Sequence, residues 1–409
     1  MAESLRILWL KTGPLHPLDT GGKLRTYHML RELARHHAVT FLALKPPDAS
    51  NAILSAASEY SASQVWITWR EKPKGSVGFY LELAGNLFSP LPYVISKYRC
   101  KEMSHAIAEL GRREKHDLIV CDFLTPSVNL FAPDVTVALP TLLFQHNVEA
   151  VIWERHVQAA GSGLKRAYFK LQWRRLRDYE RCVSARFDGV VAVSPEDARR
   201  MRQDYGLGNV LGAVPTGVDV DYFGSFKPRP EQGRLVFVGS MDWMPNIDGV
   251  CWFAEEIFPR IQAARPETKL AIVGRRPTGR VHELARKNPA ITVTGTVDDV
   301  RPYLSQAEAI VVPLRVGGGT RVKIYEAMAA GVPVVSTTIG AEGLEVAHGE
   351  NILLADEPED FARQTLRLLG EPALRQSLSQ NALRLVRERF GWPAVTAVFA
   401  GYCQQIVRK

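Results

Sequence analysis

The sequence has 409 residues, about twice the length of an ordinary domain, so two domains are expected. Its 46% hydrophobic and 23% charged residues exclude large disordered segments. The sequence has no uninterrupted apolar run of about 18 residues, so a membrane-spanning helix is not expected. The net charge of +8 favours anionic partners such as nucleotides, phosphorylated substrates or a membrane surface.

The first half alternates short apolar strands with amphipathic helices. The apolar run near the N-terminus lacks a basic lead and a cleavage site, so it is interpreted as a buried strand. Helices are predicted over Lys23–Arg35 and Cys100–Arg113. Continuously apolar strands separated by helices predict a parallel sheet covered on both faces. The expected strands are Leu5–Leu10, Val39–Leu44, Val65–Thr68, Leu118–Cys121, Thr141–Gln145 and Gly189–Val193.

Between these strands, Lys165–Arg186 is strongly basic and interleaved with aromatic residues. Two interpretations stay open: a solvated helix with a packed aromatic stripe, or contact with an anionic membrane leaflet or lipid-phosphate acceptor. No nucleic-acid-binding motif accompanies the charge, so nucleic acid is not expected as a partner. The aromatic residues concerned are Tyr168, Phe169, Trp173 and Tyr179.

A second series of strands and helices follows a linker rich in turns at Gly212–Gly233. We expect an α/β protein with two Rossmann-like, doubly wound domains facing each other across a cleft. The predicted domains are 1–212, completed by the C-terminal helix 392–409, and 213–391. The expected strands are Leu235–Gly239, Leu270–Gly274, Ile291–Val293, Ala309–Pro313, Val332–Ser336 and Ile352–Ala355; the expected helices are Asp248–Ala263, Asp299–Gln306, Thr320–Ala330, Arg375–Phe390 and Ala394–Lys409.

A glycine run after the strand ending at Pro313 has the pattern of a phosphate cradle. The residues Gly317, Gly318 and Gly319 let backbone N–H groups approach a ligand, and Thr320 is positioned to cap the helix that follows. The alternative is a surface loop before an ordinary helix.

The first turn of that helix carries Arg321 and Lys323, although cations are unfavourable at a helix N-terminus. An anion explains their placement better than helix stability does, because Arg and Lys both bind phosphate. One turn further, the carboxylate of Glu326 can accept hydrogen bonds from a ribose diol.

The run PLRVGGGTRVKIYEAMAAGVPVVST resembles the signature of glycosyltransferase family 4, and shorter fragments such as PTGVDVDYF and FVGSMDWMPN agree. The resemblance implies a GT-B fold and transfer of a sugar from a UDP- or GDP-sugar to a hydroxyl acceptor, with retention of anomeric configuration. It also implies that no metal and no prosthetic group are needed. In this setting Arg321, Lys323 and His146 are the expected catalytic residues, the two cations stabilising the departing diphosphate.

The sequence departs from the family pattern at three positions. Gly318 stands where the family commonly has the first of two glutamates, while Glu326 fits the second. Many members also carry Arg and Lys where this chain has Ser240 and Asn246, which are still expected to bind the donor. We therefore expect the two cations after the glycine run to supply the missing charge.

In the first domain, Gly21 and Gly22 are expected to bring backbone donors near the donor phosphate. His146 and Asn147 end a strand and are expected at the cleft edge. Asp122 is a weaker acceptor-side candidate, for which a helix-capping role is the slightly favoured alternative.

Further candidates lie in the second domain. By resemblance, the backbone near Thr296 and Val297 holds the nucleobase, and Asp242 lines the cleft. Asp219 and Asp221 superficially match an Asp-x-Asp metal motif, but they lie in the linker turn and are not expected to bind metal.

The rival enzyme class is a nucleotide-sugar epimerase of GT-B architecture, and a non-catalytic nucleotide-sugar-binding subunit stays open. A dinucleotide-dependent oxidoreductase is disfavoured because no Gly-x-Gly-x-x-Gly follows the first strand. The five scattered cysteines form no Cys-x-x-Cys pair and fit a reducing cytoplasm. We expect a cytoplasmic protein at the inner leaflet, acting on a lipid-linked or glycan acceptor in cell-envelope or extracellular polysaccharide or glycolipid synthesis.

Overall fold

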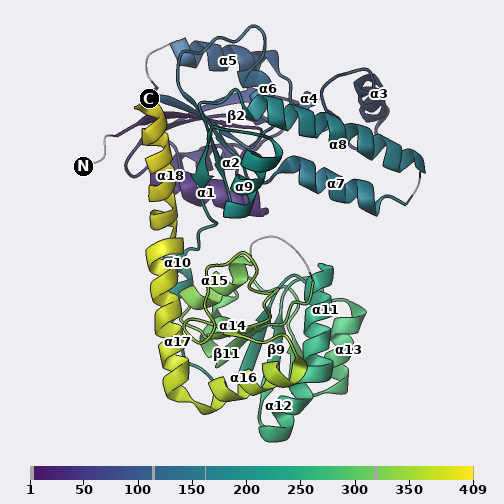
Figure 1. The fold of residues 1–409 in the computed structure, drawn as a ribbon, viewed down its shortest axis with the longest axis vertical. Helices are drawn as coiled ribbons and strands as arrows, with labels where there is room; N and C mark the ends of the chain where they lie inside the picture. Colours follow the sequence, from purple (N-terminus) through teal and green to yellow (C-terminus); the bar gives the residue numbers. More distant parts are fainter. Residues whose placement is uncertain (1–3, 113–115, 162, 317–320, 409) are drawn as a thin grey trace. The chain divides into compact units, whose positions relative to one another are not determined.

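The computed structural model describes residues 4–112, 116–161, 163–316 and 321–408. The chain divides into two compact units. Unit 1 comprises Met1–Pro215 and Val395–Lys409, and unit 2 comprises Thr216–Ala394. Each unit is an α/β structure built on its own parallel sheet (Figure 1).

Unit 1 contains a seven-stranded sheet in the order β3-β2-β1-β4-β5-β6-β7, with every neighbouring pair parallel. The first strand lies inside the sheet and the chain winds outward on both sides of it, as in a doubly wound fold. The carboxyl ends of β1, β4 and β5 are therefore neighbours. The strands are β1 (Arg6–Lys11), β2 (Ala38–Lys45), β3 (Ser63–Thr68), β4 (Leu118–Asp122), β5 (Thr141–Phe144), β6 (Gly189–Ala192) and β7 (Val210–Ala213).

Strand β7 was not predicted from the sequence, because it is short and contains Gly212. The structure shows why a glycine stands there: an ideal Cβ on Gly212 would lie 2.1 Å from the hydroxyl oxygen of Tyr402. Tyr402 belongs to the C-terminal helix α18 (Trp392–Val407), most of which lies in unit 1.

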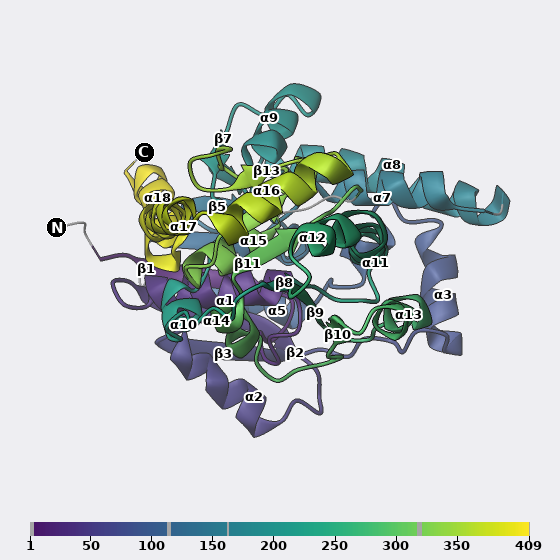
Figure 2. The same cartoon turned by 90° about the horizontal axis from the view of Figure 1, so that it is seen from below.

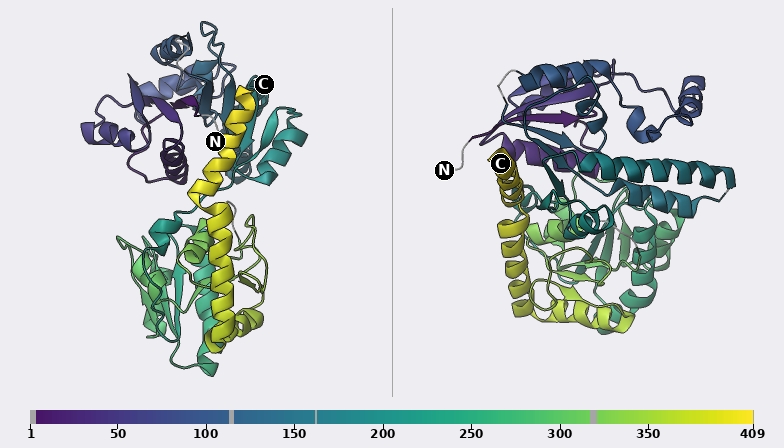
Figure 3. Two further views of the ribbon diagram at one scale, coloured as in Figure 1. Left: turned by 90° about the vertical axis from the view of Figure 1, so that its left-hand side faces the viewer. Right: turned by 45° about the horizontal axis from the view of Figure 1, so that its top comes forward.

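Helices cover both faces of this sheet. On one face, Phe399 of α18 packs against Trp9 and Phe144, with ring centroids 5.7 Å and 4.9 Å away. Figure 3 shows α7 and α8 running side by side as a long hairpin of unit 1. The remaining helices of unit 1 are α1 (Gly21–Leu33), α2 (Asn51–Ser55), η1 (Ala56–Glu59), α3 (Val77–Asn86), α4 (Tyr93–Ser96), α5 (Lys101–Arg112), α6 (Ser127–Leu130), α7 (Glu149–Ala159), α8 (Gly163–Ser184) and α9 (Pro195–Asp204).

Unit 2 contains a six-stranded parallel sheet in the order β10-β9-β8-β11-β12-β13. Its strands are β8 (Arg234–Val238), β9 (Lys269–Val273), β10 (Ile291–Val293), β11 (Ala309–Val312), β12 (Val334–Ser336) and β13 (Leu353–Leu354). Figure 2 shows its helices, which are α10 (Val220–Gly224), α11 (Met244–Trp252), η2 (Phe253–Ile257), α12 (Phe258–Ala264), α13 (Gly279–Lys287), α14 (Arg301–Gln306), α15 (Val322–Ala329), α16 (Pro358–Gly370), α17 (Pro372–Leu385) and η3 (Val386–Phe390).

Helix α11 approaches the end of β11 closely enough to require a glycine. An ideal Cβ on Gly249 would lie 2.6 Å from the carbonyl oxygen of Pro313, a backbone atom that cannot rotate away. The close approach holds the amino end of α11 at the carboxyl end of the sheet.

We therefore expect Gly249→Ala to destabilise the protein by about 1–3 kcal/mol, because overpacking against backbone outweighs the better helix propensity of alanine. Urea unfolding followed by circular dichroism measures the loss. Gly279→Ala is the matched control, since nothing lies within 4 Å of an ideal Cβ on Gly279 at the start of α13. Equal stability of the two variants would contradict this account.

Candidate active site

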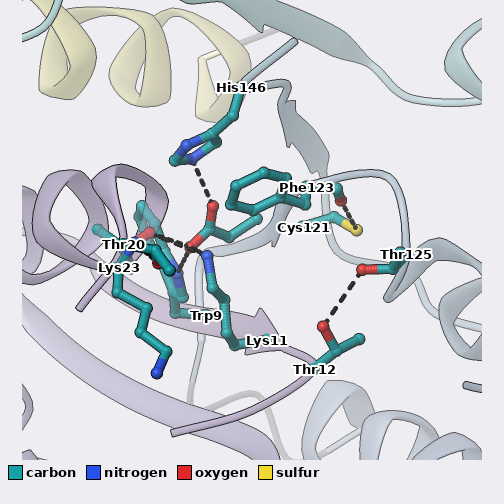
Figure 4. Close-up of polar contacts among 11 residues, drawn as sticks. Trp9, Lys11, Thr12, Thr20, Lys23, Cys121, Phe123, Thr125 and His146 are labelled. Carbon is teal, nitrogen blue, oxygen red and sulfur yellow. Dashed lines mark hydrogen bonds and ion pairs between the residues drawn. The ribbon is translucent and has the colours of Figure 1, made fainter. Parts of the chain in front are cut away.

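The carboxylate of Asp122, the last residue of β4, is fully buried at the carboxyl end of the unit 1 sheet. Its Oδ2 accepts hydrogen bonds from Trp9 Nε1 (3.0 Å), Lys11 Nζ (2.6 Å) and Thr26 Oγ1 (2.7 Å). Its Oδ1 lies 2.7 Å from Nε2 of His146, which follows β5 (Figure 4). The helix-capping interpretation of Asp122 is wrong, because the carboxylate instead joins side chains of β1, α1 and the segment after β5.

Charge in this cluster is set by burial. Burial opposes ionisation of Asp122, but Lys11 and His146 outweigh it and hold the pKa of the carboxyl below its usual range. Burial lowers the pKa of Arg25, on α1, to about 10 and lowers that of Lys11, which Asp122 partly restores. Lys11 forms an ion pair with Asp122 at 2.6 Å, and Arg25 interacts electrostatically with both Asp122 and Asp197.

Burial also lowers the pKa of His146 to about 4; Asp122 opposes this shift, while Lys11 and Arg25 reinforce it. The imidazole is therefore neutral at neutral pH. Phe123 stacks on it, with ring centroids 3.8 Å apart, from a backbone with a φ of 71°. The ammonium of Lys11 lies 4.2 Å from the centre of the same Phe123 ring.

The two predicted phosphate-loop glycines differ in their surroundings. An ideal Cβ on Gly22 would lie 2.8 Å from the Phe123 ring, so this glycine lets α1 approach the cluster. Nothing lies within 4 Å of an ideal Cβ on Gly21, which begins α1. The hydroxyl of Thr20 caps that helix by accepting from the backbone N–H of Lys23 at 3.4 Å.

Asn147, next to the cluster in sequence, is exposed. Its side chain bonds to Glu149, whose pKa is raised to about 7 by burial and by the nearby carboxylate of Glu180. Glu180 in turn accepts from the backbone N–H of Glu149 at 2.8 Å, at the first turn of α7. Glu180, which also accepts from the backbone N–H of Ala150, therefore caps the start of α7.

In unit 2, β8 and β11 are adjacent in the sheet, so the helices that follow them begin side by side. Lys323 Nζ, in the first turn of α15, donates to Asn246 Oδ1 of α11 at 2.8 Å. The guanidinium of Arg321 lies 5.5 Å from the centre of the Trp243 ring. The structure therefore brings the two predicted cations to the amino end of α11.

Glu326 and Lys323 line one small cavity beside Val238, the last residue of β8. Burial raises the pKa of Glu326 to about 7, and Lys323 opposes the shift. Burial lowers the pKa of Lys323 to about 8, although Glu326 favours its charged form. A lysine that stays mostly protonated at neutral pH and a carboxyl group that titrates near neutrality thus lie together in α15.

Ser240 is one of the neutral positions where the family resemblance implies a cation. In the structure, a cation that follows another strand contacts it. Arg275 Nε, after β9, donates to Ser240 Oγ at 2.8 Å. Ser240 Oγ donates to Asp242 Oδ1 at 2.5 Å, and Asp242 also pairs with Arg276 at 3.3 Å. The side chain of Asn246 completes the loop by donating to the Ser240 carbonyl at 2.8 Å.

Sequence reasoning missed several of these residues. The pair Arg275 and Arg276 directly follows a predicted strand, and that position was the available signal. In unit 1, Lys11 and Arg25 were passed over because single basic residues at a strand end or on a helix are usually solvated.

The remaining predicted positions are placed as follows. Thr296 is exposed and Val297 partly buried in the segment after the edge strand β10. Asp219 caps α10, its Oδ1 accepting from the N–H of Tyr222 at 2.9 Å, as a linker-turn residue would. The four residues Gly317, Gly318, Gly319 and Thr320 lie outside the described residues, and α15 begins after them at Val322.

The described residues contain neither a metal-binding cluster nor a membrane-spanning helix. No group of three or more His, Cys, Asp or Glu side chains there could hold a metal ion. No helix there is long and apolar enough to cross a membrane.

Comparison with known proteins places both units in glycosyltransferase families. The family described as "Glycosyltransferase Family 4" matches residues 20–222, and "Glycosyl transferases group 1" matches residues 232–371. A Klebsiella pneumoniae protein described as an uncharacterized 44.6 kDa protein in the cps region is 22% identical over 69% of this chain and 73% of its own length.

Two further proteins resemble this chain, one in sequence and one in fold. A phosphatidyl-myo-inositol mannosyltransferase of Mycolicibacterium smegmatis is 28% identical over 51% of this chain, which spans 55% of that relative's length. The HepE protein of Anabaena, solved in complex with UDP-glucose, aligns with a TM-score of 0.60 at 15% identity, covering 98% of this chain and 100% of its own.

Two Rossmann-like parallel sheets, each with polar residues at its carboxyl end, define a GT-B glycosyltransferase. The chain belongs to glycosyltransferase family 4.

The buried histidine gives a pH prediction. The pKa of His146 is about 4 in the folded chain and about 6.5 when unfolded, so the unfolded chain binds the extra proton between these values. The stability that neutral His146 contributes is present above about pH 6.5 and is lost as the pH falls to about 4. We expect the wild type to lose about 3 kcal/mol more than His146→Gln over this range.

Urea unfolding at a series of pH values measures the difference. His105→Gln, at an exposed position on α5, is the matched control and should follow the wild-type curve. Parallel pH profiles for the wild type and His146→Gln would refute the burial of a neutral imidazole.

Proposed function

We propose that this chain transfers a sugar from a nucleotide-diphosphate sugar to a hydroxyl acceptor with retention of anomeric configuration. The observation that carries the proposal is the half-buried Lys323 at the start of α15, close to Arg321 and bonded to Asn246. A cation at a helix N-terminus opposes the helix dipole, and burial adds to the cost, so the arrangement is best explained by a bound anion. The donor diphosphate supplies that anion.

The same residues account for the proposed chemistry. When the bond between the sugar and the diphosphate breaks, negative charge develops on the departing oxygen. Arg321, Lys323 and the amino end of α15 stabilise that charge, so that no metal is required. The acceptor oxygen forms the new bond on the face that the diphosphate leaves, and its proton passes to the departing phosphate oxygen.

The rest of the donor is assigned to residues around this centre. Glu326 is proposed to accept hydrogen bonds from the ribose diol, and the backbone of Thr296 and Val297 to hold the base. Ser240 and Asn246 contact the phosphates, together with the backbone of Gly317, Gly318, Gly319 and Thr320 as the sequence pattern suggests. A protein of this fold binds UDP-glucose, which supports a UDP- or GDP-sugar as donor.

In unit 1, His146 is proposed to orient the donor sugar, with Asp122 fixing the orientation of its ring. Lys11 and Arg25 bring two basic side chains to this end of the sheet, which favours a donor or acceptor carrying phosphate. Gly21 and Gly22 at the start of α1 are proposed to approach the donor phosphate, and Asn147 and Asp242 to contact the acceptor or donor.

The acceptor is proposed to be a glycan or lipid-linked glycan of cell-envelope or extracellular polysaccharide or glycolipid synthesis. Two relatives support this assignment: one encoded in a cps region and one that mannosylates phosphatidyl-myo-inositol. Such an acceptor places the protein in the cytoplasm, at the inner leaflet of the membrane.

The cationic assignment predicts a loss of donor binding. Replacing both Arg321 and Lys323 with Ala should weaken nucleotide-sugar affinity by about 100-fold or more, because each removes a charge-assisted contact of about 1.5–3 kcal/mol. Thermal-shift titration with UDP- and GDP-sugars measures it. The exposed pair Arg286→Ala/Lys287→Ala on α13 removes the same charge from unit 2 and should leave affinity unchanged. Equal affinities for the two double variants would overturn the assignment.

The proposed reaction predicts transfer that survives chelation. With the matching donor and an acceptor glycan, the wild type should form a glycoside with the donor's anomeric configuration, with undiminished rate in EDTA. Nuclear magnetic resonance of the product reads the configuration. Isomerised nucleotide sugar formed without acceptor would instead establish an epimerase, and an inverted product or loss of activity in EDTA would contradict the mechanism.

A further inference from the structure

Helix α3 of unit 1 exposes an apolar face. Val77, Tyr80, Leu81, Ala84 and Phe88 recur at intervals of three or four residues, and all are exposed. The exposed fractions are 76% for Val77, 67% for Leu81 and 92% for Phe88. Side chains three and four apart lie on one face of a helix, so these residues form a single stripe continued by the residue just beyond its end. We call this stripe the α3 outer face.

The opposite face of α3 is held firmly by its own unit. The Phe79 ring packs edge-on against Tyr93, with centroids 5.9 Å apart, and the Tyr93 hydroxyl donates to Glu82 Oε2 at 3.0 Å. Two contacts from α8 fix the far end. Gln172 Nε2 donates to Asn86 Oδ1 at 2.9 Å, and Arg175 Nη1 donates to the Asn86 carbonyl at 2.8 Å.

These contacts engage one side of α3 only. Because Asn86 is buried and bonded to α8, the helix cannot turn its outer face inward without breaking these hydrogen bonds. The outer face therefore stays in water in the isolated chain, although apolar surface of this extent is unfavourable there. Such a surface marks an interaction site.

Cations are frequent in the segments next to α3. Arg70 and Lys72 line one pocket together with Glu82 and Gly85 of α3. Residues 163–175 of α8 contain five cationic and no acidic side chains, and residues 70–99 contain five cationic and two acidic ones.

The aromatic residues of α8 do not compete for the same role. Phe169 packs against Trp153 of α7 with ring centroids 5.9 Å apart, and Tyr179 bonds to Ser127 at 2.8 Å. They serve the hairpin and the core, as in the packed-stripe interpretation of this helix. Most cations of α8 are exposed, as is Leu164 at its start, whereas the exposed apolar stripe belongs to α3.

We propose that the α3 outer face docks on an anionic lipid membrane. Its apolar side chains enter the boundary between headgroups and acyl chains, while the cations of α8 and of the segment before α3 contact lipid phosphates. Charge argues for lipid over a second copy of this chain, because a two-fold interface would bring the same cations face to face. The proposal rests on the proposed function for its purpose, meeting a membrane acceptor, but the binding itself needs no catalysis.

The test is sedimentation of the full chain with vesicles of phosphatidylcholine alone or mixed with phosphatidylglycerol. Wild type should bind the anionic vesicles, and Phe88→Asp should reduce that binding by about tenfold or more, because an aromatic side chain that would enter the membrane is replaced by a charge. Lys165→Gln/Lys170→Gln should weaken binding and reduce its salt dependence. Val398→Asp, at a position of α18 that is 47% exposed, is the matched control and should bind like the wild type.

Phe88→Asp should retain the wild-type thermal shift with nucleotide sugars, which shows that it is folded and separates docking from donor binding. Equal vesicle binding by Phe88→Asp and wild type would overturn the proposal, as would binding indifferent to lipid charge. So would a wild-type dimer, seen by sedimentation equilibrium, that Phe88→Asp dissociates. Failure of nucleotide binding in the wild type would refute the proposed function and leave the vesicle result standing.

Discussion

The carboxyl end of the unit 1 sheet depends on one buried carboxylate. Asp122 has no access to water, so its charge is tolerable only because β1, α1 and the segment after β5 supply Trp9, Lys11, Thr26 and His146. Lys11 Nζ also donates to the hydroxyl of Thr26, and Phe123 stacks on the ring of His146. Lys11 pairs directly with this carboxylate, while Arg25 interacts electrostatically with both Asp122 and Asp197.

Unit 2 meets a similar electrostatic problem with a different arrangement. Ser240 and Asn246 are neutral, yet Arg275 contacts Ser240 and Lys323 contacts Asn246. Positive charge is thus delivered to the same loop from the ends of β9 and α15. A phosphate site responds to the position of charge in space, so the cation can come from any element whose end reaches that point.

The two neighbouring helices α3 and α8 expose different kinds of side chain: α3 an apolar stripe and α8 mainly cations. The sequence of α3 is apolar on both faces, a pattern typical of a buried helix. The sequence of α8 is basic and interleaved with aromatic residues. In the structure, Phe169 and Tyr179 of α8 turn inward toward α7 and the core, as a packed aromatic stripe predicts, and one face of α3 is left in water. Which apolar residues are covered depends on where Asn86 and Gln172 meet, and they are 86 positions apart.

The sequence by itself determined the two parallel sheets and the family, because continuous apolar runs specify buried strands and a contiguous motif carries its own spacing. It also located His146, Asp122 and Lys323 at the ends of strands or the start of a helix. It did not reveal β7, whose four residues and internal glycine carry too weak a pattern, nor the charge states of the site. Lys11 and Asp122 are 111 positions apart in the chain, and only the adjacency of β1 and β4 turns a solvated lysine and a capping aspartate into a buried pair. Burial and pKa are properties of neighbours in space, so the tertiary structure alone decided them.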